Sequence, residues 1–372
     1  IDHINMYILV LGGTGAMGNH LINILAEAGH QVYVSTRSDR INTHNITYLK
    51  GNAHESLFLE RVLSERSYDC IVDFMVYNTP EFAQRHPLLL RSTSQYLFLS
   101  SARVYARSAD RQITESSSRL LDICDDEEYL RTDDYALTKA RQENMLFCAK
   151  TQNWTIIRPY ITFSEIRLQL GVFEKEDWLY RALHGRPIVF SKDIAPHYTA
   201  LTYGYDVAKG IAGLVGNPKA LGETFHIVTA ESHTWGEIAH LYVETLKETM
   251  GIVPELVMVD RCFFLNDDRA KFSVKYSRLF DYHYDNSKIL RFVPDLKFKP
   301  TMEGLRDCLK IFMTQPSFRK IYTWSQANLD RDIGGYTPLS EWKTSHDKAT
   351  YLFYRYMPYS VVNWIKEQRR KI

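Results

Sequence analysis

The chain lacks any apolar run long enough to cross a membrane as a helix, and no secretory signal precedes its first predicted strand. It also lacks an excess of charge of either sign. The formal net charge is only +1, which gives no general attraction to nucleic acids or to acidic partners. We therefore expect a cytoplasmic protein with no integral membrane segment and no nucleic-acid partner.

Cysteine is scarce and scattered. None of the five residues forms a C-x-x-C pair or a cluster with histidine, which argues against a zinc site or a disulfide framework. We expect reduced thiols and no bound metal. These cysteines are Cys70, Cys124, Cys148, Cys262 and Cys308. Hydrophobic residues make up 45% of the 372 residues, enough to bury a sizeable core and to exclude wholesale disorder.

A glycine-rich turn lies close to the start of the chain. Gly12, Gly15 and Gly18 fall three residues apart, after the apolar run Ile8–Leu11 and before a helix-like stretch. The order strand, tight turn, helix presents backbone N–H groups and a helix N-terminus to a phosphate. Each glycine has a reason: the sharp turn, the close approach of a pyrophosphate, and the packing of helix on sheet. The turn predicts a dinucleotide site.

Strand-like runs alternate with helical patterns through the first half of the chain, which predicts a doubly wound parallel α/β sheet of the Rossmann type. We expect a dinucleotide-binding domain over residues 6–160, with a strand near 225–228 returning to it. A smaller substrate-binding lobe is expected over 161–315 and a C-terminal extension over 316–372. The expected strands are 8–11, 31–35, 46–49, 70–74, 95–100 and 154–158.

Two features fall where strands of such a sheet end. Ser100 and Ser101 follow the fifth strand, and Tyr135 and Lys139 lie four apart at the start of a helix. A free tyrosine titrates near 10, so neutral pH requires a shift of about three units, or roughly 4 kcal/mol. A lysine ammonium and a nicotinamide cation can supply that shift. Tyr135 is then the acid/base and Ser101 holds the same substrate oxygen, although each feature alone is also an ordinary helix stack or turn.

Together these motifs resemble the extended short-chain dehydrogenase/reductases, within their nucleotide-sugar epimerase/dehydratase group and its chloroplast stem-loop-binding-like branch. The resemblance spans about residues 6–310 and implies Tyr135 as acid/base, Lys139 as its partner and ribose ligand, and Ser101 as the substrate-hydroxyl contact. It rests on GGTGAMG, SSARVY, YALTK, Ile157-Arg-Pro159, Tyr205-Asp-Val-Ala208 and Asp285-Asn-Ser-Lys288, and the branch rests on Asp69-Cys-Ile-Val-Asp-Phe-Met-Val-Tyr77 with the Asn-Thr-Pro that follows.

The cofactor is expected to be NADP, with NAD as the alternative. Thr36 stands where NAD-specific sites place an acidic residue, and Arg37 follows it. An arginine pairs with a 2′-phosphate, although Arg37 can also stack on adenine with NAD bound. Asn52 stands where the family usually has an aspartate near the adenine. The expected cofactor-binding residues are Gly12, Thr14, Gly15, Ala16, Met17, Gly18, Thr36, Arg37, Asn52, Tyr135, Lys139 and Pro159.

One departure from the family narrows the chemistry. Dehydratases of this group carry Asp-Glu after the catalytic hydroxyl, whereas Ala102 and Arg103 stand there in this chain. Dehydration needs those acids, so simple hydride exchange at C4 of a nucleotide-activated sugar is expected. We favour an NADPH-dependent keto-sugar reductase, with a 4-epimerase as the alternative. A non-catalytic dinucleotide- or RNA-binding protein on this fold and an enzyme of flavonoids or steroids are less favoured.

Substrate contacts are expected from Ser101 and from the lobe. His197 replaces the arginine that the family places before its Asp-Val-Ala helix, so Lys275 and Arg278 are candidates for the positive charge that faces a diphosphate. Each is equally well a solvated surface charge. The C-terminal extension is aromatic and basic. We expect it to pack on the body or on a dimer partner rather than on a membrane, and we expect a homodimer.

Overall fold

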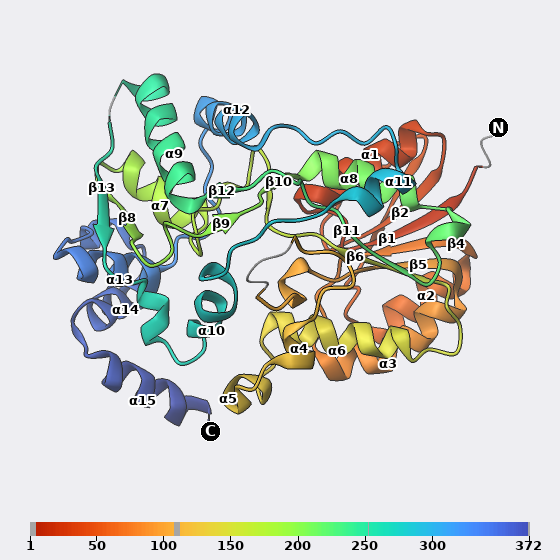
Figure 1. The fold of residues 1–372 in the computed structure, drawn as a ribbon, viewed down its shortest axis with the longest axis horizontal. Coiled ribbons are helices and arrows are strands. Elements are labelled where there is room, and N and C mark those ends of the chain that lie inside the picture. Colours follow the sequence, from red (N-terminus) through yellow and green to blue (C-terminus); the bar gives the residue numbers. More distant parts are fainter. Residues whose placement is uncertain (1–4, 108–111, 252, 371–372) are drawn as a thin grey trace. The chain divides into compact units, whose positions relative to one another are not determined.

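A computed structural model describes residues 5–107, 112–251 and 253–370. The chain divides into two compact units, coloured along the sequence in Figure 1. Unit 1 comprises residues up to 164 together with 200–232 and 282–301, and unit 2 comprises 165–199, 233–281 and 302–372. Unit 1 thus includes two later stretches of chain that our expected boundaries place in the lobe, and the C-terminal extension belongs to unit 2.

Unit 1 is built on a seven-stranded parallel sheet with the order β11-β6-β5-β4-β1-β2-β3. The predicted Rossmann-type α/β fold is confirmed. Its strands are β1 (Tyr7–Leu11), β2 (Gln31–Thr36), β3 (Ile46–Lys50), β4 (Tyr68–Asp73), β5 (Thr93–Leu99), β6 (Trp154–Arg158) and β11 (Glu223–His226). The returning strand is β11, which pairs with β6 in parallel and lies two residues before the range we expected.

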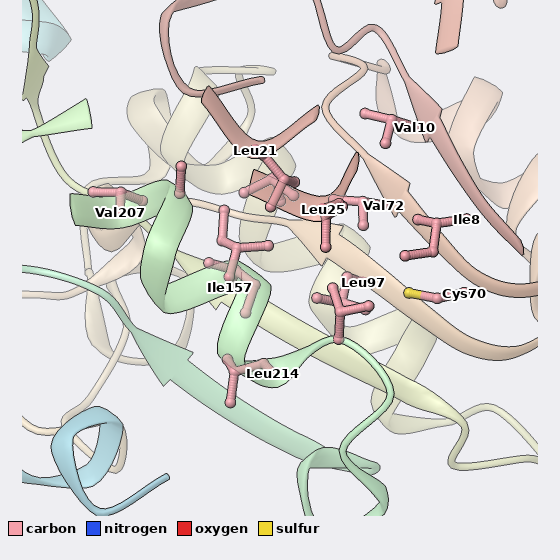
Figure 2. Close-up of a cluster of buried hydrophobic side chains, with 14 of the residues drawn as sticks. Ile8, Val10, Leu21, Leu25, Cys70, Val72, Leu97, Ile157, Val207 and Leu214 are labelled. Atoms are coloured by element: carbon pink, nitrogen blue, oxygen red, sulfur yellow. The ribbon is translucent and has the colours of Figure 1, made fainter. Parts of the chain in front are cut away.

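Both faces of the sheet are buried because successive side chains of a strand point to opposite sides. In β1, Ile8 and Val10 enter the core beneath α1 and α8, shown in Figure 2. Leu9 and Leu11 enter a second core beneath α2, α3 and α6. The helices of unit 1 are α1 (Ala16–Glu27), α2 (Ser56–Glu65), α3 (Thr79–Arg91), α4 (Leu120–Ile123), α5 (Glu127–Leu130), α6 (Tyr135–Phe147), α8 (Gly204–Leu214) and α11 (Ser287–Phe292), with 3-10 turns η1 (Ala102–Val104) and η2 (Pro218–Ala220). A two-stranded pair joins β7 (Thr162–Phe163) and β10 (Thr202–Tyr203).

Unit 2 combines helices with two short sheets, in which β8 (Ile188–Ser191) pairs with β13 (Leu256–Val259) and β9 (Tyr198–Thr199) with β12 (His233–Thr234). Its longer helices are α7 (Lys175–Leu183), α9 (Trp235–Met250), α12 (Thr301–Thr314), α13 (Thr323–Ile333), α14 (Ser345–Tyr356) and α15 (Tyr359–Arg370). The short turns are η3 (Phe263–Asn266), α10 (Lys271–Ser273), η4 (Val274–Arg278) and η5 (Leu339–Glu341). Within the described residues, the structure has no helix with the length and apolar character needed to span a membrane.

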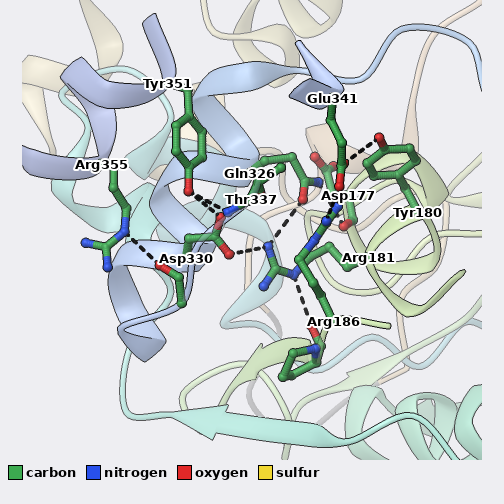
Figure 3. Close-up of polar contacts among 12 residues, drawn as sticks. Asp177, Tyr180, Arg181, Arg186, Gln326, Asp330, Thr337, Glu341, Tyr351 and Arg355 are labelled. Carbon is green, nitrogen blue, oxygen red and sulfur yellow. Dashed lines mark hydrogen bonds and ion pairs between the residues drawn. The ribbon is translucent and has the colours of Figure 1, made fainter. Parts of the chain in front are cut away.

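Buried charges fix the C-terminal extension to the rest of unit 2 (Figure 3). Arg181 of α7 donates from Nη1 to Asp330 Oδ1 of α13 over 2.9 Å, and both side chains are fully buried. The other oxygen of Asp330 accepts from Thr337 Oγ1 and from the Tyr351 hydroxyl, each over 2.7 Å. Both oxygens of the Asp330 carboxylate therefore have hydrogen-bond donors. Because these donors come from α7, from the residues after α13 and from α14, Asp330 holds α13 and α14 in one arrangement on α7.

Candidate active site

The glycine turn forms a cradle between β1 and α1. Gly12 adopts a left-handed conformation, with φ +68°, and its N–H donates to Ser35 Oγ over 2.9 Å. Gly15 is the N-cap of α1, and a Cβ built on it meets nothing within 4 Å. The first turn of α1, all of which the structure describes, carries no acidic side chain. Open space at a helix N-terminus without competing negative charge suits a pyrophosphate.

The other members of the turn serve the packing. A Cβ on Gly18 would overlap the backbone carbonyl of Gly13, so only glycine lets α1 approach the turn this closely. Thr14 offers its carbonyl oxygen to Asn19 Nδ2 over 3.2 Å. Ala16 begins α1, and the half-buried Met17 packs against the core. The geometry of Gly15 and Gly18 therefore fits two of the three predicted glycine roles, the approach of a pyrophosphate and the packing of the helix.

Because of these two roles, one alanine substitution should lower stability and the other should weaken dinucleotide binding. Gly18→Ala should lower the free energy of unfolding by about 1–3 kcal/mol because the new methyl group overpacks against backbone. Gly15→Ala should change stability by less than about 0.5 kcal/mol, but should weaken dinucleotide binding roughly 10-fold or more because the methyl group fills the cradle. Denaturant unfolding and cofactor titration of both variants test this. Equal cofactor affinity in Gly15→Ala and the wild type would contradict it.

The end of β2 holds the residues expected to choose between cofactors. Thr36 is buried, and its hydroxyl is used locally: it donates to the carbonyl of Ser38 over 3.1 Å and accepts from the N–H of Ser38. Arg37 is exposed. Asn52 follows β3, is half-buried, and accepts the N–H of His54 through Oδ1 over 3.1 Å. The N–H of Gly51 donates to Thr36 O, so the ends of β2 and β3 lie side by side.

Tyr135 lies between two cations. It occupies the first position of α6, with Asp134 as the N-cap, and is 37% exposed, so its ring is accessible. The Arg103 guanidinium lies 5.6 Å from the centre of the Tyr135 ring, and Lys139 Nζ lies 5.9 Å from it. At these distances both cations can interact with the face of the Tyr135 ring. Sequence reasoning found Lys139 by its spacing but gave Arg103 no role toward Tyr135.

Lys139 is buried and held by the carboxyl end of β5. Its Nζ donates to Leu99 O over 2.7 Å. Burial lowers the pKa of Lys139 to about 8, although the negative charges of Asp73 and Glu143 oppose the shift. Asp73 ends β4, fully buried, and accepts from the hydroxyls of Tyr77 and Tyr96 over 3.0 and 2.8 Å. Burial raises the pKa of Asp73, whereas these hydrogen bonds and the nearby Lys139 charge oppose that shift.

Ser101 lies directly after this strand. It is buried, caps η1, and its hydroxyl accepts the N–H of Arg103 over 3.1 Å. The η1 turn contacts α6, and Leu99 of the preceding strand accepts from Lys139. The structure thus brings Ser101, Tyr135 and Lys139 to one region at the carboxyl ends of the strands, where parallel sheets bind ligands.

A buried ion cluster beneath this region has Glu143 at its centre. Its carboxylate has no exposed surface and accepts from Ser100 Oγ (2.6 Å), Arg158 Nε and Nη2 (2.8 and 2.7 Å) and Arg119 Nη1 (3.1 Å). One carboxylate therefore joins α6, β6 and the turn that carries Ser101. Sequence reasoning missed this cluster, although Glu143 lies four residues after Lys139 on the same helix, a spacing that places both on one face.

Comparison with known proteins shows the family to which this chain belongs. The family described as NAD dependent epimerase/dehydratase matches residues 8–227, more than half of the chain. The chain belongs to that family. It is 26% identical over 333 residues to the chloroplast stem-loop binding protein of 41 kDa b of Arabidopsis thaliana, covering 84% of this chain and 81% of that protein.

Two solved structures of nucleotide-sugar enzymes share this fold. A UDP-glucose 4-epimerase from Bifidobacterium longum, in complex with NAD+ and UDP, matches with a TM-score of 0.61 at 15% identity, over 83% of this chain and 99% of that one. A dTDP-glucose 4,6-dehydratase from Bacillus anthracis, in complex with NAD, matches with a TM-score of 0.62 at 16% identity, over 83% and 97%. The resemblance to extended short-chain dehydrogenase/reductases is confirmed, and the family identifies the chain as an enzyme of that type.

The expected substrate contacts of this family member fall in unit 2, except Ser101. His197 Nδ1 lies 3.1 Å from Asp281 Oδ1, and Lys275 is exposed. Arg278 is buried and partly committed, because Nε donates to Gly171 O over 2.8 Å and Nη1 to Ser277 Oγ over 2.6 Å. Pro159 follows β6 in unit 1, and its carbonyl accepts the N–H of Ala102 over 2.9 Å. Pro159 therefore helps to fix the turn that carries Ser101.

A polar groove of about 690 Å³ lies at the β11 edge of the sheet and contains none of the predicted site residues. Lys288 is one of the residues that line this groove. Its Nζ donates to Glu223 Oε2 over 2.7 Å and to Thr224 O over 2.8 Å. Asp285 Oδ1 accepts the N–H of Ser287. These contacts show that the late Asp-x-Ser-Lys element joins α11 to the edge strand, a packing role.

Proposed function

We propose that this family member transfers hydride at C4 of a nucleotide-activated sugar and works as an NADPH-dependent keto-sugar reductase. The observation that carries the proposal is the accessible Tyr135 ring between Arg103 and Lys139, at 5.6 and 5.9 Å, beside the Ser101 turn. Membership of the NAD-dependent epimerase/dehydratase family supports chemistry with a nicotinamide cofactor.

Each residue of the site has a role in this proposal. When bound, the reduced cofactor supplies the hydride. Ser101 donates a hydrogen bond to the C4 oxygen of the sugar and orients it. Tyr135 gives its phenolic proton to that oxygen as the carbonyl becomes an alcohol, and the Arg103 and Lys139 charges stabilise the phenolate that remains. We also propose that Lys139, whose Nζ donates to Leu99 O, contacts the ribose.

The residues at the turn fit a dinucleotide. The cradle at Gly15 is open, Gly12 has the left-handed backbone that the turn needs, and α1 presents its N-terminus. At the adenosine end, β2 ends in Thr36 and the exposed Arg37. Without a carboxylate at Thr36 a 2′-phosphate meets no repulsion there, and Arg37 can pair with it. We therefore propose NADP rather than NAD.

Replacing Arg37 tests the choice of cofactor. Arg37→Gln should weaken NADPH binding roughly 10- to 100-fold, the worth of a charge-assisted hydrogen bond, and should leave NADH binding unchanged. Titration of protein fluorescence with each cofactor measures both affinities. Arg61→Gln removes an exposed arginine of α2 that faces Glu65 instead and should change neither. A wild type that binds NADH as tightly as NADPH would contradict the proposed cofactor.

Reduction is favoured over dehydration by the turn after Ser101. Ala102 and Arg103 provide no carboxylic acid there, and the guanidinium lies toward the Tyr135 ring. Reduction is favoured over 4-epimerisation by the proposed NADP preference, because a reductase consumes its cofactor whereas an epimerase regenerates it. Epimerisation at C4 stays the second candidate, since a UDP-glucose 4-epimerase and a UDP-N-acetylglucosamine 4-epimerase share the fold.

A substrate panel tests the function. The protein is incubated with UDP-, dTDP-, GDP- and CDP-linked sugars and 4-keto sugars, with NADPH or NADH, and products are followed by chromatography and cofactor absorbance. One cofactor oxidised per alcohol formed supports the reductase. A C4 epimer formed without net oxidation supports the epimerase. Neither product, together with tight binding of a stem-loop RNA, would favour the activity named in the Arabidopsis relative and overturn the proposal.

A further inference from the structure

The outer side of the C-terminal helices carries large apolar side chains that the rest of the chain leaves uncovered. We call this set the tail patch. Tyr356 is 60% exposed and Trp364 is 61% exposed. The tail patch comprises Leu352, Tyr356, Met357, Val361 and Trp364. Isolated exposed apolar residues are common on protein surfaces, but five within residues 352–364 form a concentration that calls for a partner.

The inner sides of the same helices are firmly held, so the exposure of the tail patch is fixed by the fold. Tyr351 of α14 is fully buried against Asp330. Val362 of α15 is buried, and Asn363 Nδ2 donates to Asn266 O over 2.9 Å. Lys366 pairs with Asp267. The remaining sides of the two helices therefore face outward.

Helical spacing groups the tail patch with positive charge. Leu352 and Tyr356 lie four apart on α14, in line with Lys348 one turn earlier, and Val361 and Trp364 lie three apart on α15. Met357 stands at the junction of the two helices. Residues 345–370 contain five Lys and Arg, of which Lys366 is paired with Asp267, against two acidic residues, whereas the whole chain has a net charge of only +1. The apolar patch thus sits in the most cationic helical segment of the extension.

Apolar side chains beside positive charge favour one class of partner over two others. A second copy of the chain would bring the same positive segment against itself, which is repulsive. Single-stranded or looped RNA stacks on aromatic rings and pairs with phosphate-binding cations, but gains little from Leu352, Met357 and Val361. A lipid surface with anionic headgroups accepts both kinds of group, because aromatic rings settle at headgroup level and aliphatic chains enter the acyl boundary.

We propose that the tail patch docks this enzyme on an anionic lipid surface, as a peripheral attachment. Tyr356 and Trp364 lie at headgroup level, Leu352, Met357 and Val361 reach the acyl boundary, and Lys348 and Arg369 face the anionic headgroups. The attachment is independent of the proposed function and requires no change in the active site. It differs from our expectation that the extension packs on the body or on a dimer partner rather than on a membrane, because it assigns the inner side to packing and the outer side to a lipid surface.

Vesicle binding tests the proposal with the full chain. Sedimentation with phosphatidylcholine vesicles containing phosphatidylglycerol should bind the protein, binding should fall with salt, and pure phosphatidylcholine should bind less. The variant Tyr356→Ser/Trp364→Ser should lose binding about 10-fold or more. The control variant Ile311→Ser/Tyr322→Ser removes side chains that are 52% and 49% exposed elsewhere in unit 2 and should bind like the wild type.

A conservative variant keeps the test sharp if the double variant fails to fold. Brominated lipids should quench wild-type tryptophan fluorescence, and Trp364→Phe should keep vesicle binding but lose most of the quenching. Absence of binding to anionic vesicles would overturn the proposal, as would an equal loss in the control variant. Two other results would also overturn it: a dimer that the double variant dissociates without any lipid binding, and a stem-loop RNA complex that it abolishes in the same way.

Discussion

Replacing Tyr135 with phenylalanine is expected to lower kcat about 10²- to 10⁴-fold, the usual contribution of a positioned general acid. The variant loses only the phenolic hydroxyl, so the Tyr135 ring keeps its place beside Arg103 and Lys139. Cofactor affinity and thermal unfolding should therefore match the wild type. Steady-state turnover of the sugar found in the panel, with a cofactor titration alongside, measures both. Turnover that survives unchanged would show that another group transfers the proton.

The same site predicts a pH dependence. The pKa of Lys139 is lowered to about 8 by burial, so its ammonium loses the proton as the pH rises through that value. The neutral amine no longer stabilises the Tyr135 phenolate, and kcat should fall on the alkaline side. Lys139→Met should be slow at every pH and should lack this alkaline decline. A wild-type rate that stays constant well above pH 8 would contradict the assignment.

Replacing Glu143 with alanine is expected to lower the free energy of unfolding by about 3–5 kcal/mol, because the buried Arg158 loses its carboxylate partner and Arg119 keeps only Asp122. Glu143 has no exposed surface and holds Ser100 as well as both guanidinium groups. Denaturant unfolding measures the loss. The effect on stability should exceed that of any substitution at Tyr135 or Ser101.

Glu127→Ala is the matched control, because Glu127 pairs with Arg131 across four residues of a helix but both side chains are 78% exposed. That pair should be worth less than about 1 kcal/mol. A Glu143→Ala variant as stable as Glu127→Ala would mean that the two buried guanidinium groups find other partners. The cluster would then not be the element that holds the Ser101 turn against α6.

The strands of the parallel sheet could be predicted from the sequence because buried parallel strands read as short apolar runs, such as Ile8–Leu11 and Trp154–Arg158. Helix α3 was missed, since Pro80 and Pro87 lie within it. Pro80 occupies the first turn, where a missing N–H costs little, and Asn78 caps the helix by accepting the N–H of Glu81. The three helices of the extension were also not predicted. Apolar residues lie on their packed sides and also on their exposed sides, so the sequence shows no clear helical period.

The site divides in the same way. Motifs in which neighbouring residues act together, such as the glycine turn and the Tyr135–Lys139 pair, are visible as spacing. Asp73 is a single carboxylate at a strand end, and its role depends on hydroxyls from Tyr77 and Tyr96. In the sequence, Arg103 is noticed only because it stands where dehydratases carry an acidic residue. In the structure, its guanidinium lies against the Tyr135 ring. Such roles come from tertiary contact, and no local pattern announces them.

The discontinuity of unit 1 has a consequence for how the chain becomes folded. Strand β6 becomes an inner strand of the sheet only when β11 pairs with it. The core on the α1 side of the sheet is complete only when α8 and α11 have packed against it. Gln95 shows the distance involved: its side chain donates to Leu214 O and accepts from the N–H of Gly216, partners 119 and 121 residues away. A ribosome must therefore release most of the chain before the sheet is complete. Until then β6 is an unprotected edge, and a fragment that ends near residue 164 would present that edge permanently and aggregate.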